Sequence, residues 1–162
     1  MGILDYLKRQ PVIAAIIIAV IVLLLIAVFR IVSRRNGWLR SHKLDSIADG
    51  VEFEHYVAWL LEEQGFHGVQ VTKGSGDFGA DVLARRDGVR YAIQCKLYSQ
   101  PVGVKAVQEI CAGRDYYHCH VGIVATNNHF TSGAEVLADK TRTVLWSGDR
   151  LARMEKAASA KK

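Results

Sequence analysis

The chain has 162 residues, of which 50% are hydrophobic, and a formal net charge of +5. This length allows one ordinary domain and one smaller segment. Residues 1–45 hold seven Lys or Arg against two Asp or Glu, whereas residues 46–162 hold fourteen of each and are neutral. The basic charge of the chain is therefore no argument for nucleic-acid binding, and a DNA-binding surface must come from local arrangement.

An unbroken apolar run over residues 12–29 is the first predicted element, and basic residues flank it on both sides. A membrane-spanning helix needs about 20 mostly apolar residues. The alternatives are a cleaved signal peptide and a buried core helix. The run is longer than the apolar part of a usual signal peptide, and no small-residue cleavage site follows it. We therefore expect residues 1–11 to precede a transmembrane helix over residues 12–32 that contacts membrane lipid.

Two basic residues precede the apolar run closely and five follow it, which favours a cytoplasmic carboxyl-terminal part. Three cysteines without a CxxC spacing agree with a reducing compartment. The expectation is a single-pass inner (cytoplasmic) membrane protein whose catalytic domain lies in the cytoplasm. Residues 33–47 would form a basic tether, residues 48–156 a folded domain and residues 157–162 a flexible tail.

The folded domain begins with a predicted amphipathic helix over residues 51–64. Glu54 falls at the edge of its apolar arc, beside Leu61. A carboxylate that faces a core is costly unless it has a partner there. Glu54 is therefore a candidate site residue, and the alternative is a boundary side chain that reaches out to solvent.

A β-hairpin follows a first predicted strand over residues 69–72. Its strands cover residues 80–86 and 90–98, and Asp87-Gly88 between them is a strong turn signal. Because side chains alternate along a strand, Gln94 and Lys96 share one face. Asp81 reaches the same place if the register of the hairpin is right. The remaining pattern predicts a helix that opens at Val102 or Gly103, runs through Cys111 and ends near Gly113. It further predicts a strand over 121–125, a helix over 133–140 with a capping box from Ser132 and Glu135, a strand over 143–146 and a helix from Asp149.

Asp81 followed by Gln94-Cys95-Lys96 resembles the PD-(D/E)XK nuclease signature in its Mrr-type restriction endonuclease form, in which Gln replaces the second acid. A single D…QxK triplet occurs by chance in many strands. Here the resemblance covers residues 50–151 in order: GVEFEHYVAWLLEEQGF precedes the hairpin, and KAVQEICAG and VATNNHFTSGA follow it. It implies an α/β fold in which a mixed central sheet is flanked by helices.

The resemblance also implies a DNA endonuclease that hydrolyses phosphodiester bonds with Mg²⁺ or Mn²⁺. Asp81 would anchor the cation, Glu54 would bind it directly or through water, and Gln94 would offer a weaker, neutral amide oxygen. The Cys95 backbone carbonyl would add another oxygen. Lys96 would orient the attacking water and stabilise developing charge. Taken singly, Asp81 could instead cap a turn, and Gln94 and Lys96 could lie on a solvated sheet face.

Candidate contacts to nucleic acid are Lys73, Ser75, Asn127 and Thr131. The last two lie where a strand ends before a helix amino terminus, a place suited to anions. They could equally serve only as caps.

Our first hypothesis from the sequence is a membrane-anchored, metal-dependent DNA endonuclease. A different class is a membrane-tethered DNA- or protein-binding module that keeps the nuclease fold without turnover. A third is an RNA- or junction-specific nuclease, and a homodimer stays open. Because residues 1–45 are assigned to the membrane and its flanks, we expect no separate DNA-reading domain and weak sequence specificity.

Overall fold

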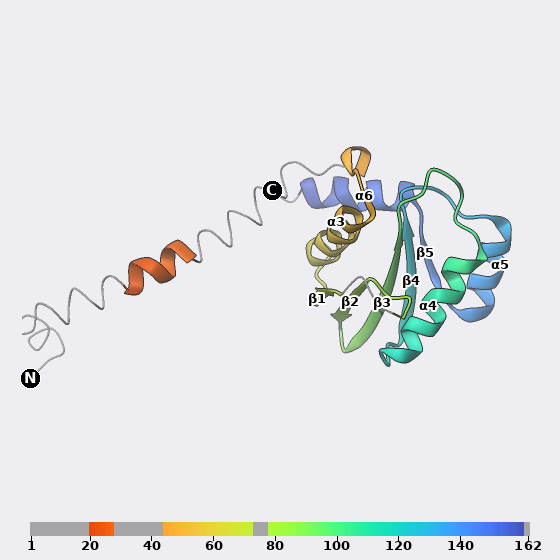
Figure 1. Ribbon diagram of the computed structural model, residues 1–162, viewed down its shortest axis with the longest axis horizontal. Coiled ribbons are helices and arrows are strands. Elements are labelled where there is room, and N and C mark those ends of the chain that lie inside the picture. Colours follow the sequence, from red (N-terminus) through yellow and green to blue (C-terminus); the bar gives the residue numbers. More distant parts are fainter. Residues whose placement is uncertain (1–19, 28–43, 73–77, 161–162) are drawn as a thin grey trace, which may run out of the picture. The chain divides into compact units, whose positions relative to one another are not determined.

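The computed structural model describes residues 20–27, 44–72 and 78–160 (Figure 1). The chain divides into two units, Met1–Ser41 and His42–Lys162. In the first unit, residues 20–27 form a helix. The rest of the predicted span over residues 12–32, and all of residues 1–11, lie outside the described residues, as does most of the predicted tether.

The predicted location of the protein in a membrane is wrong. Over residues 20–27, 44–72 and 78–160, no helix is long and apolar enough to cross a membrane.

The second unit is an α/β domain that opens with a short 3-10 helix, η1 (Leu44–Ser46). Its further elements are, in chain order, α3 (Gly50–Glu63), β1 (His67–Val71), β2 (Val82–Arg86), β3 (Val89–Lys96), α4 (Val104–Tyr116), β4 (Val121–Thr126), α5 (Ser132–Thr141), β5 (Val144–Trp146) and α6 (Gly148–Ser159).

The five strands form one mixed sheet in the order β1-β2-β3-β4-β5. β1, β2 and β3 are antiparallel to one another, whereas β3, β4 and β5 run parallel. Asp87 and Gly88 turn the hairpin with φ angles of 51° and 77°, the left-handed conformation that a tight two-residue turn requires. The predicted mixed sheet and its flanking helices are confirmed.

Helices cover both faces of the sheet, with α3 and α6 on one face and α4 and α5 on the other (Figure 1). A cluster of buried side chains fills the space beneath α4 and α5; its members include Ala80, Ala92, Val107, Ile110, Val124 and Ala134. The face of β3 that carries Gln94 and Lys96 is the one that α4 covers. It is therefore an interior face, because Gln94 is only 4% exposed, and not the solvated face of the alternative interpretation.

Two helix ends differ from the sequence prediction. α4 continues past Gly113 to Tyr116. Gly113 does not end the helix; it lies where α4 packs against the loop that precedes β2. A Cβ at Gly113 would lie 2.8 Å from the carbonyl group of Gly79. The helix α5 is capped by Thr131 rather than Ser132, since the Thr131 Oγ1 accepts a hydrogen bond from Ala134 N at 3.2 Å.

Gly79 sets how closely the loop before β2 approaches α4. Its φ angle is +88°, and a Cβ there would lie 2.3 Å from the carbonyl oxygen of Glu109. The absence of a side chain thus lets the chain pass directly over the α4 backbone. This contact fixes the position of Asp81, two residues further on, relative to α4.

We expect Gly79→Ala to lower the free energy of unfolding by about 2–4 kcal/mol, because left-handed strain and a backbone clash add together. Gly88→Ala is the matched control, since Gly88 has φ +77° but a Cβ there would meet nothing within 4 Å. It should cost only about 1–2 kcal/mol. Urea denaturation of both variants measures the difference, and equal losses would contradict a close contact at Gly79.

Candidate active site

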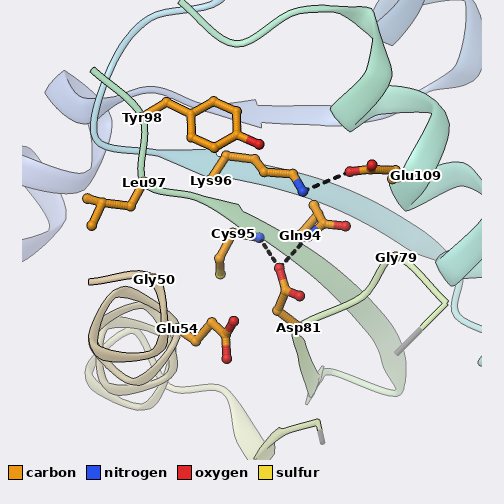
Figure 2. Close-up of a pocket in the computed structure, with 10 residues that line it drawn as sticks. All are labelled: Gly50, Glu54, Gly79, Asp81, Gln94, Cys95, Lys96, Leu97, Tyr98 and Glu109. Atoms are coloured by element: carbon orange, nitrogen blue, oxygen red, sulfur yellow. Dashed lines mark hydrogen bonds and ion pairs between the residues drawn. The ribbon is translucent and has the colours of Figure 1, made fainter. Parts of the chain in front are cut away.

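A cavity of about 370 Å³ opens at the carboxyl end of β3 (Figure 2). Its walls come from the start of α3, the loop before β2, the end of β3 and the middle of α4. The charged or hydrogen-bonding side chains that line it include Glu54, Asp81, Gln94, Lys96 and Glu109. The structure therefore brings together the four side chains that the sequence predicted as the site, and it adds Glu109.

Asp81 is held at the base of this cavity by β3. The register that pairs Val82 with Ile93 places Asp81 across from Gln94. The Asp81 Oδ2 accepts a hydrogen bond from Gln94 Nε2 and a second from the Cys95 backbone N–H at 2.6 Å. The Asp81 side chain is only 5% exposed, and such a buried carboxylate is tolerable because N–H groups of this kind solvate it.

The backbone of Asp81 is fixed by hydrogen bonds to both neighbouring segments of the chain, Thr72 just after β1 and Ile93 in β3. Its N–H donates to the carbonyl of Ile93 and its carbonyl accepts from the N–H of Thr72, both at 2.8 Å. The Thr72 hydroxyl also donates to the carbonyl of Ala80 at 2.9 Å. Asp81 therefore has little freedom to move away from Gln94.

Lys96 leaves β3 on the same face as Gln94 and forms an ion pair with Glu109 of α4 (Figure 2). Lys96 Nζ lies 2.8 Å from Glu109 Oε2, and the Lys96 side chain is 18% exposed. A second cation, Lys105 Nζ, lies 3.9 Å from Glu109 Oε1 but is 87% exposed. An exposed pair of this kind contributes little, so Lys96 is the principal partner of Glu109.

Glu109 is the lining residue that sequence analysis missed. Its signal was of the same kind as that of Glu54. Ala106, Ile110 and Gly113 are buried in α4, and Glu109 lies three residues after the first and four before the last, on the same stripe of the helix. A carboxylate at the edge of a buried helix face needs a partner there.

The ion pair determines the charge state of Lys96. Partial burial alone would lower its pKa, but the hydrogen bond and charge of Glu109 outweigh burial, with help from Tyr98 and Asp81, and the pKa lies above its ordinary value. Lys96 is therefore an ammonium group throughout the neutral and mildly alkaline range. It can stabilise negative charge and donate hydrogen bonds, but it is a poor proton acceptor.

The Cys95 thiol is affected by the charges of two carboxylates that line the cavity, Asp81 and Glu54. Its side chain points from β3 towards the α3 side (Figure 2). Burial raises the pKa of the Cys95 thiol well above its ordinary value, and the charges of Asp81 and Glu54 raise it further against a smaller opposing effect of Lys96. The charges of Glu54 and Asp81 thus both act on the Cys95 thiol, although Glu54 belongs to α3 and Asp81 lies just before β2.

Asn127 and Thr131, two of the other predicted contacts, do not line this cavity. Asn127 Oδ1 accepts from the Tyr98 N–H at 2.9 Å, and Asn128 Nδ2 donates to the Tyr98 carbonyl at 3.2 Å. Asn127 also lines a second cavity of about 330 Å³ at the start of α6. Thr131 caps α5. Lys73 and Ser75 lie outside the described residues, so the structure does not place them.

The donors around the cavity suit a hard cation with a small protein ligand set. Within the part of the chain that the structure describes, no three His, Cys, Asp or Glu side chains cluster as a metal site. Two carboxylates, from Glu54 and Asp81, line the wall formed by α3 and the segment before β2, and the Gln94 amide and the Cys95 carbonyl supply neutral oxygens. Oxygen ligands of this number fit Mg²⁺, which usually keeps several waters.

Comparison with known proteins now identifies the domain. Residues 46–155, more than half of the chain, match the family model Mrr_cat, described as restriction endonuclease. The chain belongs to this family. The predicted Mrr-type identity is thereby confirmed for the folded domain. No curated protein matches the sequence.

Three solved structures resemble this Mrr_cat domain, and the first two, with TM-scores above 0.5, share its fold. A protein of unknown function, AF1548, is 25% identical, with a TM-score of 0.54 and 67% of each chain covered. The DNA modification-dependent restriction endonuclease AspBHI is 19% identical with a TM-score of 0.51, over 68% of this chain and 31% of its own. The MspJI restriction endonuclease in complex with a 27-mer oligonucleotide is 20% identical with a TM-score of 0.48, over 63% and 26%. The matched region is therefore less than a third of either restriction enzyme.

Replacing Asp81 by Asn should increase the rate at which iodoacetamide alkylates Cys95. The Asp81 charge raises the pKa of this thiol, so its loss lowers the pKa and increases the fraction of reactive thiolate at pH 8. Cys119 is the internal control, because burial raises its pKa and Asp81 is not among the causes. Mass spectrometry gives the ratio of the two rates, and an unchanged ratio would contradict the electrostatic link.

Proposed function

We propose that this Mrr_cat domain is a metal-dependent DNA endonuclease that hydrolyses phosphodiester bonds. The observation that carries the proposal is the convergence of Asp81, Gln94 and Lys96 with Glu54 on one cavity of a restriction-endonuclease family domain. A carboxylate-lined wall that can hold a cation faces an ammonium group that can bind a phosphate oxygen. Hydrolysis of a phosphodiester needs both.

The charge of the cavity supports a requirement for a cation. Three of its lining side chains are carboxylates, from Glu54, Asp81 and Glu109, and one is an ammonium group, from Lys96. Such a site would repel a DNA phosphate. A divalent cation would balance the excess negative charge and make the cavity able to accept an anionic substrate.

Asp81 and Glu54 are the residues we propose as the charged ligands, with the Gln94 amide oxygen and the Cys95 carbonyl as neutral ones. A bound Mg²⁺ or Mn²⁺ would lower the pKa of a coordinated water and neutralise charge on the phosphate. Gln94 donates from its Nε2 to Asp81. The amide group must therefore rotate by about half a turn before its oxygen can face a cation bound by Asp81. This exchange is the one rearrangement that we expect of the site.

The reaction joins a water oxygen to phosphorus and breaks one phosphorus–oxygen ester bond, and a proton passes to the oxygen that leaves. In this proposal Lys96 donates hydrogen bonds to the attacking water and to a non-bridging phosphate oxygen. It stabilises the charge that develops in the transition state. It does not take the proton, because it already carries one.

The test compares the full chain with Asp81→Ala and Lys96→Ala in the nicking of supercoiled plasmid with Mg²⁺. We expect each variant to lose at least ~100-fold in rate, because each removes a group that stabilises the transition state. Lys105→Ala is the matched control, since it removes an exposed ammonium group from the same helix as Glu109. It should nick at the wild-type rate.

The same experiment separates turnover from binding. Chelation with EDTA should abolish nicking by the wild-type protein. If no protein nicks but all still retard DNA in a gel, the fold is kept for binding and the nuclease proposal is wrong. Direct conversion of plasmid to the linear form would add support for a homodimer, because cutting both strands together takes two active sites.

We expect the nicks to be spread over many sequences. The side chains that line the cavity are suited to phosphate and water, and phosphate contacts carry no direct sequence information. Mapping of nicked ends by primer extension on one plasmid would show this. A ladder confined to a few sites, or dependence on a modified base, would show that a reader of base identity acts with this domain.

A further inference from the structure

We propose that Glu109 is a positioning residue of the active site, which holds the Lys96 ammonium group in place against the carboxylate-lined wall. This inference rests on the proposed nuclease function. The Lys96 Nζ–Glu109 Oε2 distance of 2.8 Å is that of a direct, charge-assisted contact. Both residues line the cavity that contains Asp81.

The need for positioning follows from the nature of lysine. Its ammonium group sits on a flexible four-carbon stem, and fixing that stem costs rotamer entropy. Lys96 is the last residue of β3, at the carboxyl end of the central strand of the sheet. Catalysis requires the ammonium group to be in place before the transition state forms. A fixed carboxylate on the facing wall supplies this restraint.

Glu109 is itself well fixed. The backbone carbonyl oxygen of Glu109 lies 2.3 Å from the position that a Cβ of Gly79 would take, so α4 is in backbone contact with the loop that leads to Asp81. A second close approach, between Gly113 and the same loop, holds the next turn of α4. The two glycines therefore fix Glu109 relative to Asp81, and Glu109 in turn fixes Lys96.

The pair is also electrically matched. The Glu109 Oε2 atom is buried, although the Glu109 side chain as a whole is 31% exposed, and a buried carboxylate oxygen without a cation beside it is unfavourable. Lys96 is 18% exposed and close, whereas Lys105 is 87% exposed and more distant. Lys105 therefore cannot replace Lys96 as the partner of Glu109, and the restraint is specific to the residue at the site.

The test uses the full chain and two readouts. The first is competitive acetylation of lysines at pH 8 with acetic anhydride, followed by mass spectrometry of the Lys96 peptide relative to exposed Lys140. Acetylation requires the neutral amine. Glu109→Gln removes the opposite charge in direct contact with Lys96 and should raise the relative acetylation rate of Lys96 by ~10-fold, the order of effect expected when such a partner is lost. Glu109→Asp keeps the charge and should restore most of the protection, whereas Lys105→Gln should leave Lys96 unchanged.

The second readout is plasmid nicking across the pH range. In Glu109→Gln we expect kcat to fall ~10-fold with KM within about twofold, because positioning acts on the transition state. The decline in rate at alkaline pH should move to lower pH, since Lys96 then loses its proton sooner. A general loss of structure would lower the rate at all pH values and leave that decline where it was.

The outcomes separate this inference from the proposed function. Unchanged Lys96 acetylation in Glu109→Gln overturns the pairing. Changed acetylation with an unchanged kcat, in a protein whose Lys96→Ala variant is inactive, overturns the role of Glu109 in the reaction. If Glu109→Gln changes Lys96 acetylation but the wild-type protein does not nick DNA, the pairing is supported and only the nuclease function is overturned.

Discussion

The register of the β2–β3 hairpin is the constraint on which the candidate site depends. Pairing Val82 with Ile93 brings the Asp81 carboxylate to the Gln94 amide and to the Cys95 N–H. A shift by one residue would turn Gln94 and Lys96 to the opposite face of the sheet, because side chains alternate along a strand. The tight turn at Asp87-Gly88 enforces the register, and the site follows from it.

This part of the site was predictable because its information is local. Strand-forming residues on both sides of Asp87-Gly88 define the hairpin, and alternation places Gln94 and Lys96 on one face. The mixed sheet also followed, since the later strands alternate with helices. The edge position of Glu54 in the apolar arc of its helix nominated it once Asp81 and Lys96 were available as partners, and the structure places it in the cavity wall.

What could not be predicted depends on contacts between elements distant in sequence. Gly113 had the local character of a helix end, but in the fold it allows α4 to approach the loop at Gly79. The edge position of Glu109 in α4 is a local signal, but its pairing with Lys96 depends on how α4 packs against β3.

The two sides of the cavity divide the electrostatic work of the proposed reaction. On one wall, Asp81 and Glu54 leave negative charge that a cation can balance. On the other, Glu109 compensates Lys96 and keeps it charged. If Lys96 lacked its own counterion, the carboxylates of the first wall would be its nearest partners, and the ammonium group would compete with a cation for them. Glu109 on α4 adds negative charge to the proposed DNA site, but it also keeps the Lys96 ammonium group away from the cation. Each positive group then lies opposite its own carboxylate partner.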